Sequence, residues 1–198
     1  MSNDTATETA DHDTASNVLC ACPAVGSSRA THCQRLLTRA GQPESIVGVT
    51  IATSPAERLA AWRDAIDPAT TEISFVNVTH GGRSATMSTN GSGGGEEVPT
   101  DIVEIGEMDL RRLGTEITAQ LREASGAPTA LCFDSLTDVL QFESKERIHR
   151  FLNVVTARVT EAGAYAHYHI DSNGHANPTF ETLAPVFDET VSDGIEFE

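Results

Sequence analysis

The feature that most constrains this chain is a regular alternation of two kinds of segment. Short runs rich in apolar and β-branched residues are separated by longer stretches in which apolar residues recur every three or four positions. The first pattern is typical of buried strands and the second of amphipathic helices. Strands that alternate with helices pair in parallel, and the helices cover both faces of the sheet. The sequence therefore predicts a three-layer α/β domain with a mainly parallel sheet.

The same patterns place the individual elements along the chain. We expect strands at residues 17–22, 45–53, 72–79, 101–105, 129–134 and 164–171, with a short terminal strand at 194–197. We expect helices at residues 28–39, 109–123, 145–162 and 179–191, and one that begins after residue 54. That last helix has a clear start signal, because Ser54 can cap it and Pro55 suits its first position.

Two segments lack the pattern of packed structure. Residues 1–16 are polar and acidic and show no apolar periodicity, so we expect a disordered tail. Residues 81–99 are rich in glycine and serine, which predicts a flexible surface insertion. The rest of the chain, residues 17–198, is predicted to form a single domain.

The charge balance limits the classes of partner. The chain has 29 acidic residues against 13 Lys and Arg, a formal net charge of -16, and its only lysine is Lys145. An acidic, lysine-poor surface suits a halophilic protein, because concentrated salt screens the self-repulsion. An acidic mesophilic protein is the alternative. The charge argues against direct nucleic-acid binding, which needs a basic face, and no basic patch is visible in the sequence.

The apolar runs and the cysteines indicate a compartment. The apolar runs are too short to span a membrane, and residues 1–16 do not resemble a secretory signal, so we expect a cytoplasmic protein without a membrane partner. Its cysteines should then be reduced. Cys20 and Cys22 have no second cysteine pair to complete a tetrahedral metal site. We interpret these two residues and Cys132, all in apolar runs, as small buried hydrophobic residues.

The loop after the first strand is the first candidate site, because ligands bind at the carboxyl ends of parallel strands. A phosphate-binding loop needs glycines, a lysine and a Ser or Thr for magnesium. Gly26, Ser27, Ser28 and Arg29 stand at the corresponding place, without a lysine. The free N–H groups of the helix N-terminus could still attract an anion. A plain strand-to-helix connection, capped by one of the serines, is the alternative.

Three further segments resemble the KaiC-like branch of the RecA superfamily, above all its haloarchaeal members. Residues 130–137 are similar to the Walker B strand, with Asp134 as its acid. Residues 50–59 are similar to the end of the family's second strand and the Ser-Pro start of its next helix, and residues 163–171 to a late strand. The resemblance implies an archaeal protein with a RecA-like P-loop fold, whose relatives assemble side by side.

The resemblance also implies groups that this chain lacks. In the family, a pair of glutamates ends the second strand and activates the attacking water, whereas Ala52 and Thr53 stand here. The Walker A lysine is missing too, and only Asp134 remains. Phosphoryl transfer depends on positioning and charge stabilisation of the γ-phosphate. We therefore expect at most weak binding of ATP and magnesium, at residues 26–29 and Asp134, without efficient hydrolysis.

The late strand suggests a different chemistry. His167, His169 and Asp171 alternate, so all three share one face of that strand. Imidazole and carboxylate suit zinc or iron, which makes the three a candidate metal site. The segment also resembles the metallo-β-lactamase signature, but Ser172 stands where its last histidine belongs. We favour the alternative that both histidines are neutral and hydrogen-bonded and face a helix or the cleft.

These observations lead to one main hypothesis about function. The chain is predicted to be a non-catalytic regulatory or interaction module with a RecA-like fold, which contacts protein partners or itself. One alternative is a working ATPase in which Arg29 or a neighbouring subunit replaces the lysine. The other is a metal-dependent protein that uses His167, His169 and Asp171.

Overall fold

A computed structural model gives the fold, and it describes residues 16–23, 27–67, 69–79, 100–173 and 177–192. The tail predicted at residues 1–16, apart from Ser16, lies outside the described residues. So do the insertion predicted at 81–99 and the strand predicted at 194–197. Among the described residues, no helix combines the length and apolar character that a membrane crossing requires.

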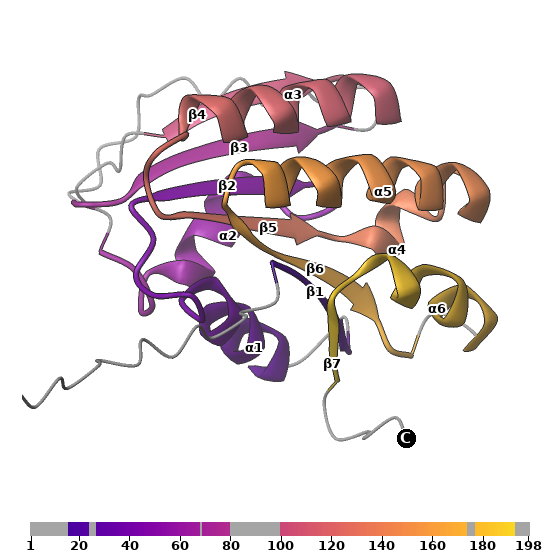
Figure 1. The fold of residues 1–198 in the computed structure, drawn as a ribbon. Coiled ribbons are helices and arrows are strands. Elements are labelled where there is room, and N and C mark those ends of the chain that lie inside the picture. The colour runs from indigo at the N-terminus through magenta and orange to yellow at the C-terminus, as the bar shows by residue number, and fades with distance from the viewer. Residues whose placement is uncertain (1–15, 24–26, 68, 80–99, 174–176, 193–198) are drawn as a thin grey trace, which may run out of the picture.

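Seven parallel strands form one sheet in the order β4-β3-β2-β5-β6-β1-β7, which confirms the parallel pairing predicted from the sequence (Figure 1). The strands are β1 (Asn17–Cys22), β2 (Ser45–Thr50), β3 (Glu72–Val78), β4 (Thr100–Ile105), β5 (Thr129–Asp134), β6 (Tyr165–Asp171) and β7 (Glu189–Ser192). Every residue of the central strands β1, β2 and β5 is buried, as expected when helices cover both faces of a sheet.

The helices complete the three layers. They are α1 (Ser27–Leu37), α2 (Pro55–Trp62), α3 (Leu110–Glu123), α4 (Leu136–Val139), α5 (Lys145–Glu161), α6 (Asn177–Leu183) and the 3-10 turn η1 (Ala184–Val186). Helices α3 and α5 cover one face of the sheet, and α1 and α2 cover the opposite face (Figure 1). Each face has its own apolar core, and the larger one lies under α3 and α5.

The smaller core depends on a glycine in the middle of the sheet. The rings of Trp62 on α2 and Phe75 on β3 stack at a centroid distance of 5.3 Å. They lie over Gly48 of β2, where a Cβ atom would come within 2.3 Å of the Phe75 ring. The glycine therefore makes room for the aromatic pair that holds α2 on the sheet.

The helix predicted at residues 179–191 is wrong in its second half. Helix α6 ends at Leu183, the η1 turn follows, and β7 then pairs with β1 in parallel. Pro185 explains the early end, because proline lacks an N–H donor and clashes with a preceding helical turn. Phe187 still packs into the larger core, as Leu183 does. Because the two residues are four positions apart, the sequence pattern resembles that of a helix. The second strand is also shorter than predicted and ends at Thr50.

Candidate functional site

A group of polar side chains lies under α1, along three neighbouring strands from their middles to their carboxyl ends. Strand β6 lies between β1 and β5, and alternate residues of each strand point to the same face. The cross-strand register places Cys132 beside His167 and Cys20 beside His169. The side chains of this α1 face are Cys20, Cys22, Cys132, Asp134, His167 and His169, and α1 adds Arg29 and Cys33.

Two arginines bind the carboxylate of Asp134. Arg29 of α1 forms an ion pair with its Oδ1 atom, and Arg58 of α2 forms one with its Oδ2 atom. Asp134 is 1% exposed and Arg58 is buried as well. A buried carboxylate needs a counter-charge, and here the chain supplies it twice. Both oxygen atoms are thus engaged at the place where the Walker B resemblance would put magnesium.

The structure brings together two of the residues predicted to bind nucleotide. Gly26 lies outside the described residues, and Ser27 and Ser28 are the first two residues of α1. Arg29 and Asp134 are brought together, but as an ion pair with each other. Arg58 was not predicted, because a charged residue inside α2 carries no local sign that it is buried.

The end of β2 offers no carboxylate at the positions of the family's glutamate pair. Ala52 is exposed and Thr53 is half-buried in the bend that follows the strand. The next acid along the chain, Glu57, accepts hydrogen bonds from the N–H and hydroxyl groups of Ser54 in the capping box of α2. It therefore serves the start of the helix rather than a water molecule near Asp134.

Four side chains that can ligate a metal meet between α1 and the sheet. They are Cys33, Cys132, His167 and His169, each no more than 1% exposed, and we call them the Cys/His cluster. One ligand atom of each lies within 4.8 Å of the other three. The Cys33 sulfur lies 3.7 Å from that of Cys132 and 3.3 Å from Nε2 of His167. The cysteines are buried as predicted, but they are more than hydrophobic residues.

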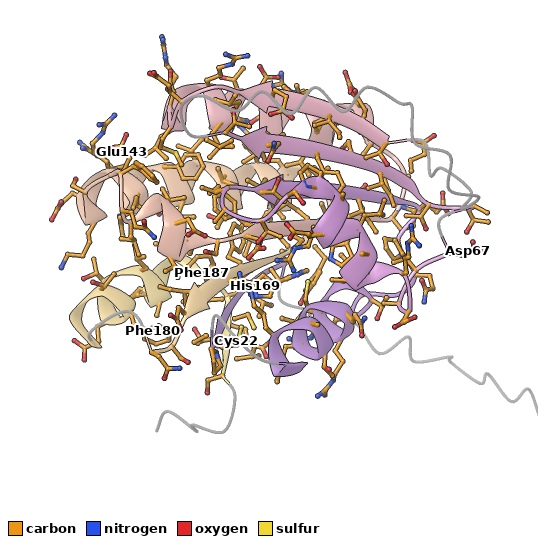
Figure 2. The ribbon with its side chains drawn as sticks, turned by 180° about the vertical axis from the view of Figure 1, so that it is seen from behind. Cys22, Asp67, Glu143, His169, Phe180 and Phe187 are labelled. Atoms are coloured by element: carbon orange, nitrogen blue, oxygen red, sulfur yellow. The ribbon has the colours of Figure 1, made fainter. Side chains whose placement is uncertain are left out.

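A second contact fixes the ring of His169. Its Nδ1 atom lies 3.7 Å from the sulfur of Cys22, and Figure 2 shows the two side chains beside one another. Ligand atoms of Cys20, Cys22 and His169 also lie within 4.8 Å of one another. Among the described residues, Nε2 of His169 and Nδ1 of His167 are buried without a hydrogen-bond partner. All four cysteines are free thiols.

The pKa values of the residues in the Cys/His cluster are shifted in different directions. A hydrogen bond with Cys132 holds the pKa of the Cys33 thiol well below its usual range, and the neighbouring His167 and His169 lower it further, against the effect of burial. Burial opposes the charge of His169, but the sulfurs of Cys33 and Cys22 together raise its pKa to about 9. Burial raises the pKa of Cys132 well above its usual range and lowers that of His167. The charged forms of Cys33 and His169 are thus favoured by the groups around them, whereas burial favours the neutral forms of Cys132 and His167.

Two donors from α2 contact the sulfur of Cys33. Nε1 of Trp62 donates to its sulfur over 3.4 Å, and Nη1 of Arg58 donates over 3.7 Å. Because Arg58 also binds Asp134, its guanidinium connects the carboxylate to the Cys/His cluster. The α1 face is therefore one continuous polar layer enclosed by apolar packing.

Asp171 does not join the two histidines with which it was predicted to form a metal site. It is half-buried, and its Oδ1 atom accepts a hydrogen bond from the N–H of Asn173. Helix α1 crosses the strand nearer its middle, so the sulfurs of Cys33 and Cys132 approach the histidines instead. The matching alternation of Cys132 and Asp134 on β5 could have revealed Cys132, whereas no local signal identifies Cys33.

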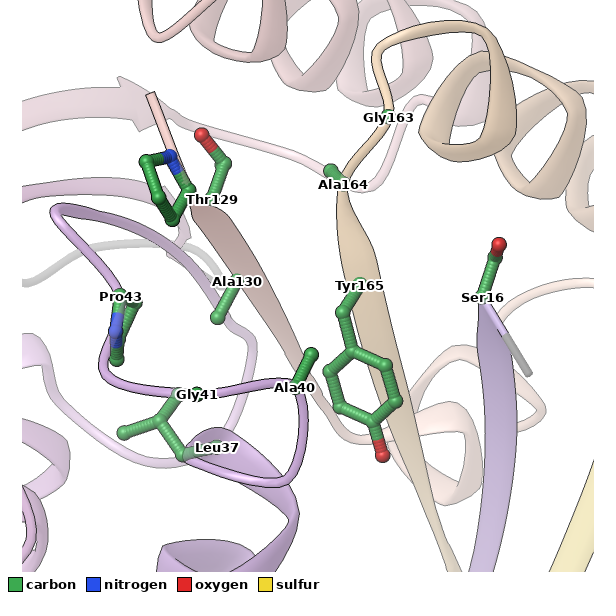
Figure 3. A pocket seen from close by; sticks show the side chains of 11 residues that line it. Ser16, Leu37, Ala40, Gly41, Pro43, Thr129, Ala130, Gly163, Ala164 and Tyr165 are labelled. Atoms are coloured by element: carbon green, nitrogen blue, oxygen red, sulfur yellow. The ribbon is translucent and has the colours of Figure 1, made fainter. Parts of the chain in front are cut away.

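A cavity of about 260 Å³ lies at the amino ends of the strands, where α1 ends and β5 and β6 begin (Figure 3). Its walls include Leu37, Ala130 and the ring of Tyr165. Burial raises the pKa of Tyr165 to about 12, so the phenol stays neutral. This lining offers little for acid–base or phosphate chemistry, in contrast to the α1 face.

A wider groove between α3 and α5 collects positive charge. Five of the chain's 13 basic residues line it, namely Arg111, Arg122, Arg147, Arg150 and Arg158. Its lining also includes Phe151 and Val154, and Val154 is 57% exposed. The sequence analysis found no basic patch, because these arginines come from two helices and converge only when the helices pack together.

Comparisons with known proteins agree with the architecture. A solved structure of a protein from Pyrococcus horikoshii OT3 is similar to this chain with a TM-score of 0.55 and 15% identity, covering 89% of this chain and 81% of that one. At this identity the likeness shows a shared fold. None of the curated proteins matches the sequence. The model of DUF7504, a family of unknown function, matches residues 15–193. The chain therefore belongs to the DUF7504 family.

Proposed function

We propose that this protein is a non-catalytic RecA-like module that acts through contacts with other proteins and not through nucleotide hydrolysis. The observation that carries the proposal is the double ion pair of Asp134 with Arg29 and Arg58. A Walker B acid must be available to magnesium, whereas this carboxylate is bound on both oxygens by cations of its own chain.

The chemistry of phosphoryl transfer favours this proposal. Hydrolysis needs a cation at the γ-phosphate and a group that positions the attacking water. The chain's only lysine, Lys145, begins α5 on the face opposite α1. Freeing Arg29 for a phosphate would break one of the two ion pairs of Asp134 and leave the buried carboxylate with Arg58 alone. The ground state of the site is therefore closed against a nucleotide.

The arrangement of the sheet supports a RecA-like ancestry. The carboxyl end of β1 and the acid at the end of β5 lie at the same end of the sheet, with β6 between the two strands. Helix α1 leaves β1 on one face, whereas α5 and α6 follow β5 and β6 on the other. In α/β sheets, ligands bind in the crevice at the point where the connections change from one face to the other. In this chain, the side chains of the α1 face lie at that point.

The groove between α3 and α5 is the surface that we expect to bind a partner. Its arginines stand out on a chain with a net charge of -16, and Val154 gives the groove an exposed apolar contact. Basic rims around apolar contacts suit an acidic segment of a partner protein. Contact with a second copy of the chain is the other form of this proposal. We place the protein in the cytoplasm of a halophilic archaeon.

The test is phosphate release from Mg·ATP in molar KCl. We expect the wild-type protein, Asp134→Ala and Arg29→Ala all to release phosphate at the rate of the buffer alone. Arg63→Ala, a change at an exposed arginine beyond α2, is the matched control. Turnover by the wild type that disappears in Asp134→Ala and persists in Arg63→Ala would refute the proposal and establish the ATPase alternative.

A further inference from the structure

We propose that Cys33, Cys132, His167 and His169 bind one zinc ion as a closed, tetrahedral structural site. The inference rests on the Cys/His cluster alone and holds whether or not the protein binds nucleotide. It changes the predicted metal site in two ways. The ligands exclude Asp171, and half of them are sulfur atoms.

The spacing of the ligand atoms fits the ion. Zinc–sulfur bonds of about 2.3 Å at tetrahedral angles put two sulfurs about 3.8 Å apart, and zinc–nitrogen bonds of about 2.0–2.1 Å put sulfur and nitrogen about 3.5 Å apart. The observed sulfur–sulfur distance between Cys33 and Cys132 is 3.7 Å. The distance from the Cys33 sulfur to Nε2 of His167 is 3.3 Å. These two distances fit tetrahedral zinc, and the other pairs of ligand atoms lie within 4.8 Å of one another.

The surroundings of the histidines point to a missing partner. Nε2 of His169 is fully buried and has no hydrogen-bond partner among the described residues. Its other nitrogen, Nδ1, already faces the Cys22 sulfur at 3.7 Å. A histidine that ligates a metal through one nitrogen usually donates its second N–H to a nearby acceptor, which fixes the ring. Cys22 takes that role here and is a positioning residue.

The charges of the site also balance with zinc present. Two thiolates and two neutral imidazoles around a divalent cation give a neutral assembly, which suits a buried position. Arg58 and Arg29 share the single negative charge of Asp134, so one net positive charge lies beside the neutral zinc site. Trp62 and Arg58 each direct an N–H donor at the Cys33 sulfur, and such donors also suit a sulfur that ligates a metal.

A disulfide between Cys33 and Cys132 is the competing use of the same atoms. A disulfide needs its sulfurs about 2.05 Å apart, so the side chains would have to approach by more than an ångström from their 3.7 Å separation. It would also leave both histidines without a role. Zinc uses all four groups at nearly their present positions.

The ion would fasten α1 to the sheet. Cys33 comes from α1, Cys132 from β5, and the histidines from β6, so a single ion joins three elements that are far apart in the sequence. With four protein ligands and almost no exposure, the site has no open position for a substrate. We therefore assign it a structural role, in which metal binding contributes to folding stability.

The first experiment measures metal on the intact wild-type chain. The protein is unfolded with reductant, refolded in molar KCl with zinc or cobalt, and dialysed extensively. We expect one zinc per chain by elemental analysis. The cobalt form should show a thiolate charge-transfer band in the near ultraviolet and the intense visible bands of tetrahedral cobalt. The zinc form should melt at a higher temperature than the chain refolded with a chelator.

Single substitutions test the ligand set. Cys33→Ser and Cys132→Ser should each weaken zinc binding by more than about 100-fold, beyond the range of positioning residues, and should each weaken the charge-transfer band, which the double variant should lack. Cys22→Ser should weaken binding by about 10-fold and keep the band. Asp171→Asn and His149→Ala, which lie outside the cluster, should bind zinc as the wild type does. Circular dichroism in the same buffer verifies that each variant is folded.

Two results would overturn the proposal. The first is a folded, fully reduced wild-type chain that retains no zinc and shows no tetrahedral cobalt spectrum. The second is a charge-transfer band that keeps its full intensity in Cys33→Ser and in Cys132→Ser, which would place the metal on other residues. Mass spectrometry of the untreated protein distinguishes a native disulfide, because that form would be two hydrogens lighter and would exclude zinc.

Discussion

Arg58 connects Asp134 and the Cys/His cluster, the two polar groups of the α1 face. Its guanidinium forms an ion pair with Asp134 and donates to the sulfur of Cys33. Inside a protein such contacts strengthen one another, because little water competes for them. A change at one of these residues should therefore be felt by the others, and the loss of a single charge should be costly.

The first prediction concerns the charge of Asp134. Asp134→Asn keeps the shape of the side chain but leaves Arg29 and Arg58 without their common counter-ion. We expect the free energy of unfolding to fall by about 3–5 kcal/mol. Urea denaturation at constant KCl measures the loss.

Glu161→Gln is the control for that measurement. Glu161 pairs with Arg158 on the surface of α5, and its side chain is 63% exposed. Removal of an exposed ion pair should cost about 0.5 kcal/mol or less. Similar losses in both variants would show that the Asp134 pairs do not stabilise the fold.

The sequence reveals some residues of the α1 face and hides others, for a physical reason. Asp134, His167 and His169 lie in strands. Because successive side chains of a strand point to opposite faces, the sequence indicates which of its residues share a face. Cys33 and Arg58 occupy helices, and their roles depend on where α1 and α2 cross the sheet. Local periodicity does not contain that information.

At the scale of secondary-structure elements, α2 is held by a close fit over β2. Gly48→Ala would place a Cβ atom 2.3 Å from the Phe75 ring and 3.0 Å from Trp62. Such overpacking typically costs about 1–3 kcal/mol. We expect a loss at the upper end of that range, read from the midpoint of chemical denaturation, because the stacked rings cannot both move aside.

Gly114→Ala is the matched control in a helix. Gly114 lies inside α3, and its added Cβ would meet Phe151 at an ordinary contact distance of 3.4 Å. Alanine is favoured over glycine in a helix interior by about 1 kcal/mol. The variant should be as stable as the wild type or more so, and an equal loss in both variants would contradict the account.

The groove between α3 and α5 gives a prediction about partners. Arg111→Glu with Arg150→Glu should abolish co-purification of the partner from the native host, because it reverses two charges in the groove. Arg35→Glu with Arg63→Glu makes the same charge change at exposed positions outside the groove and should preserve co-purification. Loss in both double variants, or in neither, would exclude the groove as the binding surface.

Sequence patterns predict the elements well where one face is continuously apolar, as in α5 and β5. They fail near the C-terminus, where Pro185 interrupts a pattern of helical spacing. Phe187 would occupy a core position whether or not the helix continued to it, so its apolar character does not reveal where the helix ends. The pairing of β7 with β1 depends on long-range contacts that a local pattern cannot contain.

At the scale of the whole molecule, charge should govern stability. A net charge of -16 produces self-repulsion in the folded state, and salt screens it. We expect the melting temperature to rise steadily from dilute to molar KCl. A melting temperature that stays constant or falls over this range, measured by circular dichroism, would contradict the halophilic interpretation.

The most direct test of the non-catalytic proposal is equilibrium dialysis of labelled ATP against the wild-type chain in molar KCl, with and without magnesium. The account predicts a dissociation constant no tighter than about 1 mM and no dependence on magnesium. Micromolar binding that requires magnesium and is lost in Asp134→Ala would contradict it.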